Sequence, residues 1–276
     1  MISPRTTLAS AADNASSPSP SGALRPGDSY VQSFARGLSV ISTFCEQHPE
    51  QTLSDVAART GLTRAGARRI LLTLQTLGYV QCEGRLFRLT PKILGLGFAY
   101  LSSQPLWNHA EPLMESLVQD IRESCSAAVL DGTDIVYVMR VPTHKIMSIN
   151  LGIGSRLPAY CTSMGRVLLS GLPDEQLDVV LGATPPERHT PRTVTSITEL
   201  RKIVLKVRAQ GWCLVNQELE EGLVSVAVPV RDRNRRVIAA MNVSGQVNRT
   251  SAQQMTRRIL PALQATALAV SALLQR

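Results

Sequence analysis

The chain has 276 residues, of which 44% are hydrophobic, so it exceeds a usual single domain and can bury more than one core. Its 29 lysines and arginines against 21 acidic residues give a net charge of +8, which suits a polyanionic partner. Five cysteines without a close pair exclude a disulfide framework and a CxxC metal site. No apolar run predicts a membrane span or a signal peptide, so we expect a cytoplasmic protein.

Residues 1–29 are rich in serine, alanine and proline and predict a disordered tail. Residues 30–90 show three stretches of helical periodicity and then a β-hairpin pattern with Glu83-Gly84 at its turn. Residues 91–104 are apolar at helical spacing. They predict a linker helix, and another core helix fits the same pattern equally well.

Residues 105–276 mix helices and strands. Asp131-Gly132-Thr133-Asp134 is a hairpin signature, and Ser196 with Glu199 three residues later predicts the start of a helix that ends at Gly211. Three strands follow within residues 214–245, and then a closing helix capped by Ser251, which Pro261 can kink. This half is expected to be α+β around a mainly antiparallel sheet.

The stretch LTRAGARRILLTLQTLGYV, residues 62–80, combines an apolar face with a cationic tip. On a helical wheel the apolar side chains share an arc of roughly 140°. They are Ala67, Ile70, Leu71, Leu74 and Leu77. Arg64 and Arg68 fall together outside the arc, and Arg69 flanks them beyond the small Ala65. One face should pack while the other presents guanidinium groups.

The residues before this helix have the spacing of a helix-turn-helix. Ser54 is a plausible N-cap for the preceding helix, Gly61 can supply the positive φ of the turn, and Leu62 is expected to be a buried hinge. Thr63 can cap the second helix.

Between Arg59 and Lys92 the sequence has seven basic residues and one acidic residue, Glu83. Such a patch can bind DNA phosphates, and an arginine near the start of a recognition helix can pair with guanine. A solvated arginine-rich face is the alternative, but the turn spacing, cap and hairpin together favour DNA. The predicted DNA-binding residues are Thr63, Arg64, Ala65, Arg68, Arg69 and, on the hairpin wing, Arg85 and Arg88.

These segments resemble the IclR family of bacterial transcriptional regulators, from about Tyr30 to the C-terminus. The resemblance is carried by VQSFARGLSVISTF, LSDVAARTGLTRAGARRILLTLQTLGYV, GRLFRLTPKILGLGFAYL, LPAYCTSMGRVLLSGLP and LVNQELEEGLVSVAVPVRD. RAGARR, DIVYVMRVP and LPAYCTSMGR look most like the branch that controls aromatic-acid catabolism through protocatechuate, 4-hydroxybenzoate and β-ketoadipate.

The resemblance implies an N-terminal winged helix-turn-helix over residues 30–90, a linker helix over 91–104 and a GAF-like effector domain over 105–276. It also implies a homodimer or tetramer on double-stranded DNA with dyad symmetry. A small aromatic or dicarboxylic acid would then shift the operator-binding state or the contact with RNA polymerase. No cofactor is implied.

By the same resemblance, the effector pocket lies over the C-terminal sheet. The matching positions are Asn216, Ser225, Asn242 and Ser244, with Thr162, Ser163, Met164 and Gly165 closing one side. Asn242 and Ser244 are two apart on a strand and share one face, and hydroxyls at a helix N-terminus can bind a carboxylate. Without the resemblance, Asn242 and Ser244 fit solvent exposure as well. Some family members have an acidic residue where Asn216 stands and a cysteine where Ser225 stands.

Arg140 could grip a carboxylate, or it could be a cation at the sheet edge or a dimer interface. An enzyme that uses Cys161 with His109, His144 or His189 is a weaker alternative, because no GxSxG, HExxH or phosphate-binding loop is present beyond a weak GIG at 152–154. A nucleoid-type DNA binder without ligand control is also weaker, since the second half is long for a dimerisation module. We therefore expect no catalytic residue.

Overall fold

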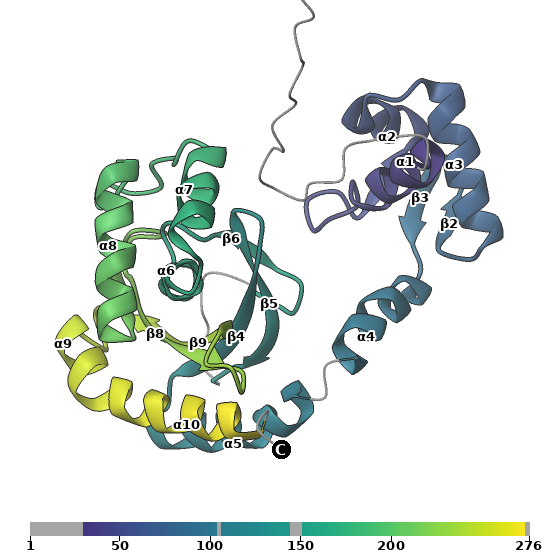
Figure 1. Ribbon diagram of the computed structural model, residues 1–276. Coiled ribbons are helices and arrows are strands. Elements are labelled where there is room, and N and C mark those ends of the chain that lie inside the picture. Colours follow the sequence, from purple (N-terminus) through teal and green to yellow (C-terminus); the bar gives the residue numbers. More distant parts are fainter. Residues whose placement is uncertain (1–29, 104–105, 144–150, 274–276) are drawn as a thin grey trace, which may run out of the picture. The chain divides into compact units, whose positions relative to one another are not determined.

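The computed structural model describes residues 30–103, 106–143 and 151–273, so the predicted tail lies outside the described residues. Contacts within the chain divide it into two compact units, one ending at Ile93 and the other beginning at Leu94 (Figure 1). Each unit has its own hydrophobic core.

The first unit is a helix-turn-helix followed by a β-hairpin. Its elements are α1 (Gln32–Ile41), β1 (Glu50–Thr52), α2 (Leu53–Thr60), α3 (Arg64–Thr76), β2 (Val80–Glu83), β3 (Leu86–Leu89) and the 3-10 turn η1 (Pro91–Ile93). The hairpin prediction is confirmed, but β1 was not foreseen: it pairs with β3, so the sheet order is β1-β3-β2. A three-residue strand carries too little periodicity to be recognised in the sequence.

The packing face of α3 agrees with the wheel except at its end. Ala67, Leu71 and Leu74 are buried and Ile70 is half-buried against them. Leu77 is 51% exposed because it is the residue at which the helix stops. The wheel assumed a helix that continues through residue 77.

The cap of α2 also differs from the prediction. Thr52, not Ser54, is the N-cap: its hydroxyl accepts from the Asp55 amide at 3.3 Å, and Asp55 accepts in return from the Thr52 amide at 2.9 Å. The turn residue Gly61 has φ +65°, as expected. The cap fixes the start of α2, and the Gly61 turn sets the angle at which α3 leaves it.

The second unit is built on a six-stranded antiparallel sheet of order β6-β5-β4-β9-β8-β7. Its strands are β4 (Ser124–Asp131), β5 (Asp134–Val141), β6 (Arg156–Pro158), β7 (Cys213–Asn216), β8 (Leu223–Arg231) and β9 (Val237–Gln246). Its helices are α4 (Leu94–Ser102), α5 (Leu106–Ile121), α6 (Ser163–Ser170), α7 (Asp174–Ala183), α8 (Ile197–Gln210), α9 (Ala252–Gln254) and α10 (Leu260–Leu273). This confirms the α+β prediction.

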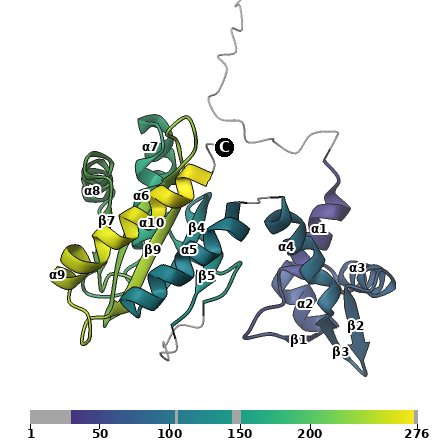
Figure 2. The same cartoon turned by 90° about the horizontal axis from the view of Figure 1, so that it is seen from below.

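Helices cover both faces of this sheet. Figure 2 shows α5 and α10 side by side along one face, where they enclose a core with alternate residues of β8 and β9 such as Val226 and Met241. Helices α6, α7 and α8 cover the other face and pack with Ala128, Ala227 and Ala240. Alternation along each strand therefore decides which helical layer a side chain meets.

Two predicted details are confirmed and one changes. Gly132, with φ +63°, forms the tight β4–β5 turn, and α8 is capped by Ser196 and ends at Gly211. The closing helix departs from α geometry before Pro261, in the π-helical turn η2 (Met255–Ile259). Proline has no amide hydrogen to donate, so the preceding turn must rearrange its hydrogen bonds. No helix within the described residues is long and apolar enough to span a membrane.

Candidate DNA-binding surface and effector cavity

The start of α3 presents a compact set of cations. The Thr63 hydroxyl accepts from the Gly66 amide at 3.1 Å and so caps the helix, as predicted. Arg64, Arg68 and Arg69 are exposed, and none of these side chains has an ion pair or hydrogen bond within the described residues. Ala65, between them, is exposed and small. The helix can therefore approach a polyanion closely with three uncommitted guanidinium groups.

The basic residues after α3 are less uniform than the sequence suggested. Arg85 is exposed in the tight turn between β2 and β3. Arg88 forms ion pairs within the small sheet, since its guanidinium lies 2.6 Å from the Glu83 carboxylate and 3.5 Å from that of Glu50. Lys92 donates to the Leu77 carbonyl at 2.8 Å and so satisfies the end of α3. Of the predicted DNA-binding arginines, Arg64, Arg68, Arg69 and Arg85 have no ion pair within the described residues.

One end of the larger sheet is polar on the face that α6 covers. Near its centre that face is lined by alanines, and towards the end the same strands carry serines and an asparagine. In register they form the rows Ser126, Asn242, Ala227 and Ser124, Ser244, Ser225. Hydroxyl and amide groups so placed on an apolar layer face α6 rather than open solvent, and Asn242 and Ser244 are 5% and 9% exposed.

A cavity lies over this polar end. Six of the predicted effector residues line it, namely Thr162, Ser163, Met164, Ser225, Asn242 and Ser244, together with Tyr137, Leu151, Leu157, Cys161, Val215, Glu218, Leu219 and Leu223. The Ser225 hydroxyl donates to Ser163 at 2.9 Å. Within the described residues, the Asn242 carbonyl oxygen Oδ1 is buried and has no hydrogen-bond partner. A buried acceptor without a donor costs free energy, so a ligand group that donates a hydrogen bond to Oδ1 would be stabilised in this cavity.

The cavity also meets the start of α6. Thr162 caps this helix by accepting from the Gly165 amide at 3.2 Å. The first amides of a helix have no intrahelical acceptor, and the helix dipole favours negative charge at this end. The wall therefore offers an acceptor at Asn242 and an electropositive end at Ser163.

Three predicted effector residues do not line the cavity. Gly165 lies under it: a Cβ there would overlap the Ala159 carbonyl oxygen, so glycine lets α6 pack against residues 158–160. Asn216 follows Val215 on β7 and faces away from the cavity wall, because neighbouring residues of a strand point to opposite faces. Arg140 is in register with Ser126, outside the lining residues.

Sequence reasoning missed the acidic side chain of this cavity, Glu218. Gln217 has a positive φ of 63°, so the strand alternation that excludes Asn216 breaks at that residue and Glu218 turns inward. Both Glu218 oxygens accept from Arg166, each at 2.6 Å. Since Arg166 neutralises it, Glu218 adds no net charge to the wall.

Tyr137 was also missed, although its place on β5 could be read from alternation with Ile135. Burial raises the pKa of its hydroxyl to about 12, so it is neutral and can donate a hydrogen bond at physiological pH. No hydrogen bond of this hydroxyl is found among the described residues.

The structure provides no support for a cysteine nucleophile. Burial raises the pKa of Cys161 to about 12, which leaves almost no thiolate near neutral pH. His189 bonds to Tyr160, His109 is exposed on α5, and His144 lies outside the described residues. Among the described residues there is no group of three or more potential ligands that could hold a metal ion.

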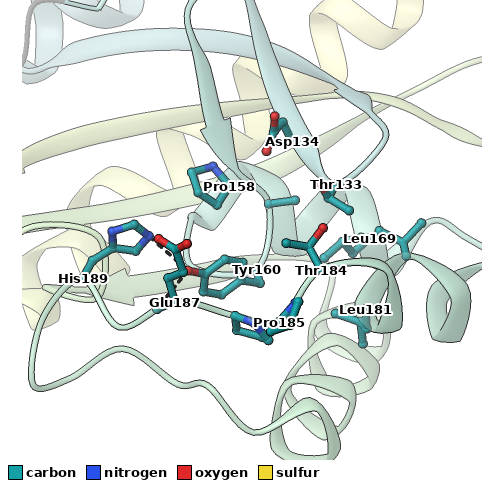
Figure 3. Close-up of a pocket in the computed structure, with 13 residues that line it drawn as sticks. Thr133, Asp134, Pro158, Tyr160, Leu169, Leu181, Thr184, Pro185, Glu187 and His189 are labelled. Atoms are coloured by element: carbon teal, nitrogen blue, oxygen red, sulfur yellow. Dashed lines mark hydrogen bonds between the residues drawn. The ribbon is translucent and has the colours of Figure 1, made fainter. Parts of the chain in front are cut away.

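A second cavity in the same unit is larger. Its volume is about 230 Å³, whereas that of the cavity at Asn242 is about 30 Å³ (Figure 3). It is lined by Thr133, Asp134, residues 158–160, Leu169, Val180, Leu181, residues 184–187 and His189. None of the predicted effector residues belongs to it, so size and predicted chemistry point to different cavities. The smaller one, which contains the buried unpaired acceptor, is the candidate effector cavity.

Comparison with known proteins agrees with both halves of this description. Residues 33–84 match the family model of the IclR helix-turn-helix domain, and residues 98–272 match that of the bacterial transcriptional regulator IclR C-terminal domain. The Pca regulon regulatory protein of Pseudomonas putida is 44% identical over 85% of this chain and 81% of its own length. The p-hydroxybenzoate hydroxylase transcriptional activator of Acinetobacter baylyi is 34% identical over 87% of this chain and 90% of its own length.

A solved structure is similar over nearly its whole length. The IclR homologue from Microbacterium hydrocarbonoxydans, crystallised as a complex with 4-hydroxybenzoate, has a TM-score of 0.77 and 25% identity and covers 88% of this chain and 99% of its own. The helix-turn-helix, the antiparallel sheet with helices on both faces and these similarities lead to one conclusion: the chain belongs to the IclR family of bacterial transcriptional regulators.

Proposed function

We propose that this protein controls genes of aromatic-acid catabolism by binding a promoter through its helix-turn-helix and a small organic acid through the cavity at Asn242. The proposal is supported by relatives whose names refer to the Pca regulon and to p-hydroxybenzoate hydroxylase. The solved relative with 4-hydroxybenzoate supports the ligand class.

The DNA contact is assigned to α3. Arg64 and Arg68 stand near its N-terminal end and would reach base edges in the major groove, whereas Arg69, further round the helix, would bind phosphate. Arg85 at the tip of the hairpin would contact the backbone beside them. Arg88 would position the wing rather than touch DNA, because two carboxylates hold it.

The observation that carries the ligand assignment is the buried, unpaired Asn242 Oδ1. This oxygen can accept a hydrogen bond from a ligand hydroxyl, and the N-terminal end of α6 can bind a ligand carboxylate. A hydroxybenzoate provides a ring hydroxyl and a carboxylate together.

The size of this cavity implies that binding moves its walls. The cavity has a volume of only about 30 Å³ and can hold little more than one or two water molecules. An aromatic acid therefore requires lining side chains to shift, and Met164, unbranched and adaptable, is the lining residue best suited to do so. A ligand that must widen its own site distinguishes two states of the domain, as a regulatory effector must.

The experiment is a thermal-shift screen of 4-hydroxybenzoate, protocatechuate and β-ketoadipate. A ligand at a hundred times its dissociation constant stabilises the folded state by about 2.7 kcal/mol, which raises the melting temperature measurably. The aromatic hydroxy acids should raise it most. If none of the three acids raises it at millimolar concentration, the assignment to aromatic-acid catabolism is wrong.

The partner of α4 is proposed to be a second copy of this chain. No residue of α4 is buried, and Leu94, Leu96, Phe98 and Tyr100 are 71%, 51%, 68% and 48% exposed. The helix has no charged residue, so two copies can pack together without opposing charges. Phe98→Glu should lower the mass measured by light scattering to that of a monomer, and an unchanged mass would refute this interface.

The protein is proposed to act without catalysis. The thiol of Cys161 is neutral, and His189 bonds to Tyr160 and lines the other cavity, so these two residues do not form a nucleophile and base pair. Iodoacetamide at pH 8 should alkylate the exposed Cys45 well before Cys161. Preferential labelling of Cys161 would reopen the enzyme alternative.

A further inference from the structure

The cavity at Tyr160 and Leu181, the larger of the two described above, has an apolar floor. Ala159, Leu169 and Leu181, which are 1%, 1% and 4% exposed, form it. Pro158, Pro185 and the ring of Tyr160 stand around it, as Figure 3 shows. These flat, rigid side chains suit a flat apolar molecule. Since ligand pockets commonly measure about 300–1,000 Å³, a cavity of about 230 Å³ fits a molecule with a single ring.

The wall at Tyr160 is rigid. Its hydroxyl donates to the Glu187 carbonyl at 2.7 Å and lies 3.0 Å from Nε2 of His189. Because the hydroxyl proton is used on Glu187, the Tyr160 oxygen accepts from Nε2–H of His189. The two rings stack with 6.2 Å between centroids. The cavity is thus held open by bonds between the segment before α6 and the loop after α7.

The polar groups of the cavity accept hydrogen bonds and repel anions. Asp134 uses one carboxylate oxygen on Arg156, at 3.2 Å, and the other has no partner among the described residues. Arg156 also pairs with Asp131 at 2.6 Å, so one guanidinium faces two carboxylates and a net negative charge remains. Glu187 contributes a second carboxylate, exposed and outside any ion pair in the described part of the chain. The hydroxyls of Thr133 and Thr184 are likewise uncommitted there. A ligand here should donate hydrogen bonds and have no negative charge.

This cavity is separate from the effector cavity, although the two share a wall. Ala159 and Tyr160 face the larger cavity, while Cys161 and Thr162 face the smaller one. Arg166 braces the segment between them, since its Nε donates to the Tyr160 carbonyl at 2.8 Å. The two cavities also differ in chemistry, because only the effector cavity offers a helix N-terminus for a carboxylate.

We propose that the cavity between Tyr160, Leu169, Leu181 and Asp134 is a second ligand site, which takes an uncharged aromatic molecule with a hydroxyl group. The ring lies on the floor of Ala159, Leu169 and Leu181. The hydroxyl donates to the free oxygen of Asp134 or to a threonine hydroxyl at the rim. Aromatic acids are excluded from this site by Asp134 and Glu187.

The test uses 4-fluorophenol as the probe, with binding followed by fluorine NMR on the full chain. All titrations are made in an Asn242→Leu background, so that the effector cavity is disabled and its own success or failure has no bearing on the result. In that background 4-fluorophenol should bind saturably, whereas 4-fluorobenzoate, of similar size but negatively charged, should not bind.

Two substitutions fill the cavity from different sides. Val180→Trp fills it from α7, and Thr184→Trp closes it at the exposed rim, where the fold is least affected. Each should weaken 4-fluorophenol binding at least about tenfold. Val179→Trp is the matched control: Val179 is the neighbouring residue of α7, is 64% exposed and does not line the cavity, so binding should not change.

The proposal is overturned if 4-fluorophenol does not saturate. It is equally overturned if binding survives both Val180→Trp and Thr184→Trp, or if 4-fluorobenzoate binds at the same site in the Asn242→Leu background.

Discussion

Arg166 and Glu218 form a bidentate ion pair although they are 52 positions apart, with Nη1 and Nη2 of the arginine each 2.6 Å from a carboxylate oxygen. Their side chains are only 3% and 11% exposed. Glu218 lines the effector cavity, and Arg166 also holds the Tyr160 carbonyl of the larger one. The Glu218 carboxylate further accepts from the Val194 amide at 3.2 Å, so one pair fastens three segments around both cavities.

Removal of one partner from this pair should destabilise the effector domain strongly. Arg166→Met leaves a buried carboxylate without its cation, and the expected loss in free energy of unfolding is about 3–5 kcal/mol, measured by urea denaturation. Arg166→Met with Glu218→Leu should recover much of that loss. Lys202→Met breaks only an exposed pair with Glu199 and should change stability by less than about 1 kcal/mol. If Arg166→Met lowers the free energy of unfolding no more than Lys202→Met does, the buried pair does not stabilise the domain.

Gly165 should tolerate no side chain. Gly165→Ala would place a methyl group in overlap with the Ala159 carbonyl oxygen and force α6 away from the segment between the cavities. The expected destabilisation is about 1–3 kcal/mol. Gly182→Ala in α7 is the control: its Cβ would meet no atom within 4 Å, and the change should stabilise by up to about 1 kcal/mol. Both are measured by thermal unfolding, and a harmless Gly165→Ala would refute the packing role.

The cap of α2 should be found at Thr52. Thr52→Ala should destabilise the helix-turn-helix by about 1 kcal/mol, whereas Ser54→Ala, at an exposed position without a capping bond, should change stability by less than about 0.5 kcal/mol. If Ser54→Ala destabilised the protein more than Thr52→Ala, Ser54 would be the N-cap, as the sequence suggested.

The same cap predicts a dependence on pH. The hydrogen bond from the Thr52 hydroxyl holds the pKa of Asp55 below its ordinary value of 3.8. A lowered carboxyl pKa stabilises the fold above the ordinary value, and this stabilisation is lost as pH falls through the lowered one. Thr52→Ala should therefore flatten the acid limb of the stability profile below pH 4, and an unchanged limb would show that the bond does not set the pKa.

The arginines of the first unit should separate into three classes in mobility-shift titrations with the protein's own promoter. Arg64→Ala or Arg68→Ala should weaken binding by about 1–3 kcal/mol and relax specificity at one base pair. Arg85→Ala should weaken all sequences alike and lower the salt slope by about 0.9. Arg88→Ala should leave the salt slope unchanged. If Arg64→Ala and Arg68→Ala both bind as the wild type does, α3 is not the recognition helix.

Much of the fold could be predicted because local signals were strong. Thr63, Gly61, Gly132 and Gly211 mark caps and turns whose chemistry is local, and the periodicity of α3 separated its buried and cationic faces correctly up to its last turn. The unforeseen strand β1 depends on a partner far along the chain, β3, so its three residues show no pattern of their own.

The cavity was harder to predict than the fold. Alternation correctly grouped Asn242 with Ser244, but Glu218 depends on one left-handed residue, Gln217, that no pattern announces. The pairing that neutralises Glu218 comes from Arg166, on a helix remote in sequence. The second cavity forms where a hairpin turn, a strand end and a loop meet, so no stretch of sequence contains it.

The central claim is that Asn242 is kept polar for a ligand and not for the fold. Calorimetric titration of 4-hydroxybenzoate into the wild type and into Asn242→Leu tests it most directly, with urea denaturation of both as the control. Leucine has the same branched shape, with methyl groups in place of the amide oxygen and nitrogen, and it removes the unpaired buried acceptor, so the free energy of unfolding should stay the same or rise. Binding should weaken at least about tenfold. If Asn242→Leu binds 4-hydroxybenzoate as tightly as the wild type, the effector is not held at this cavity.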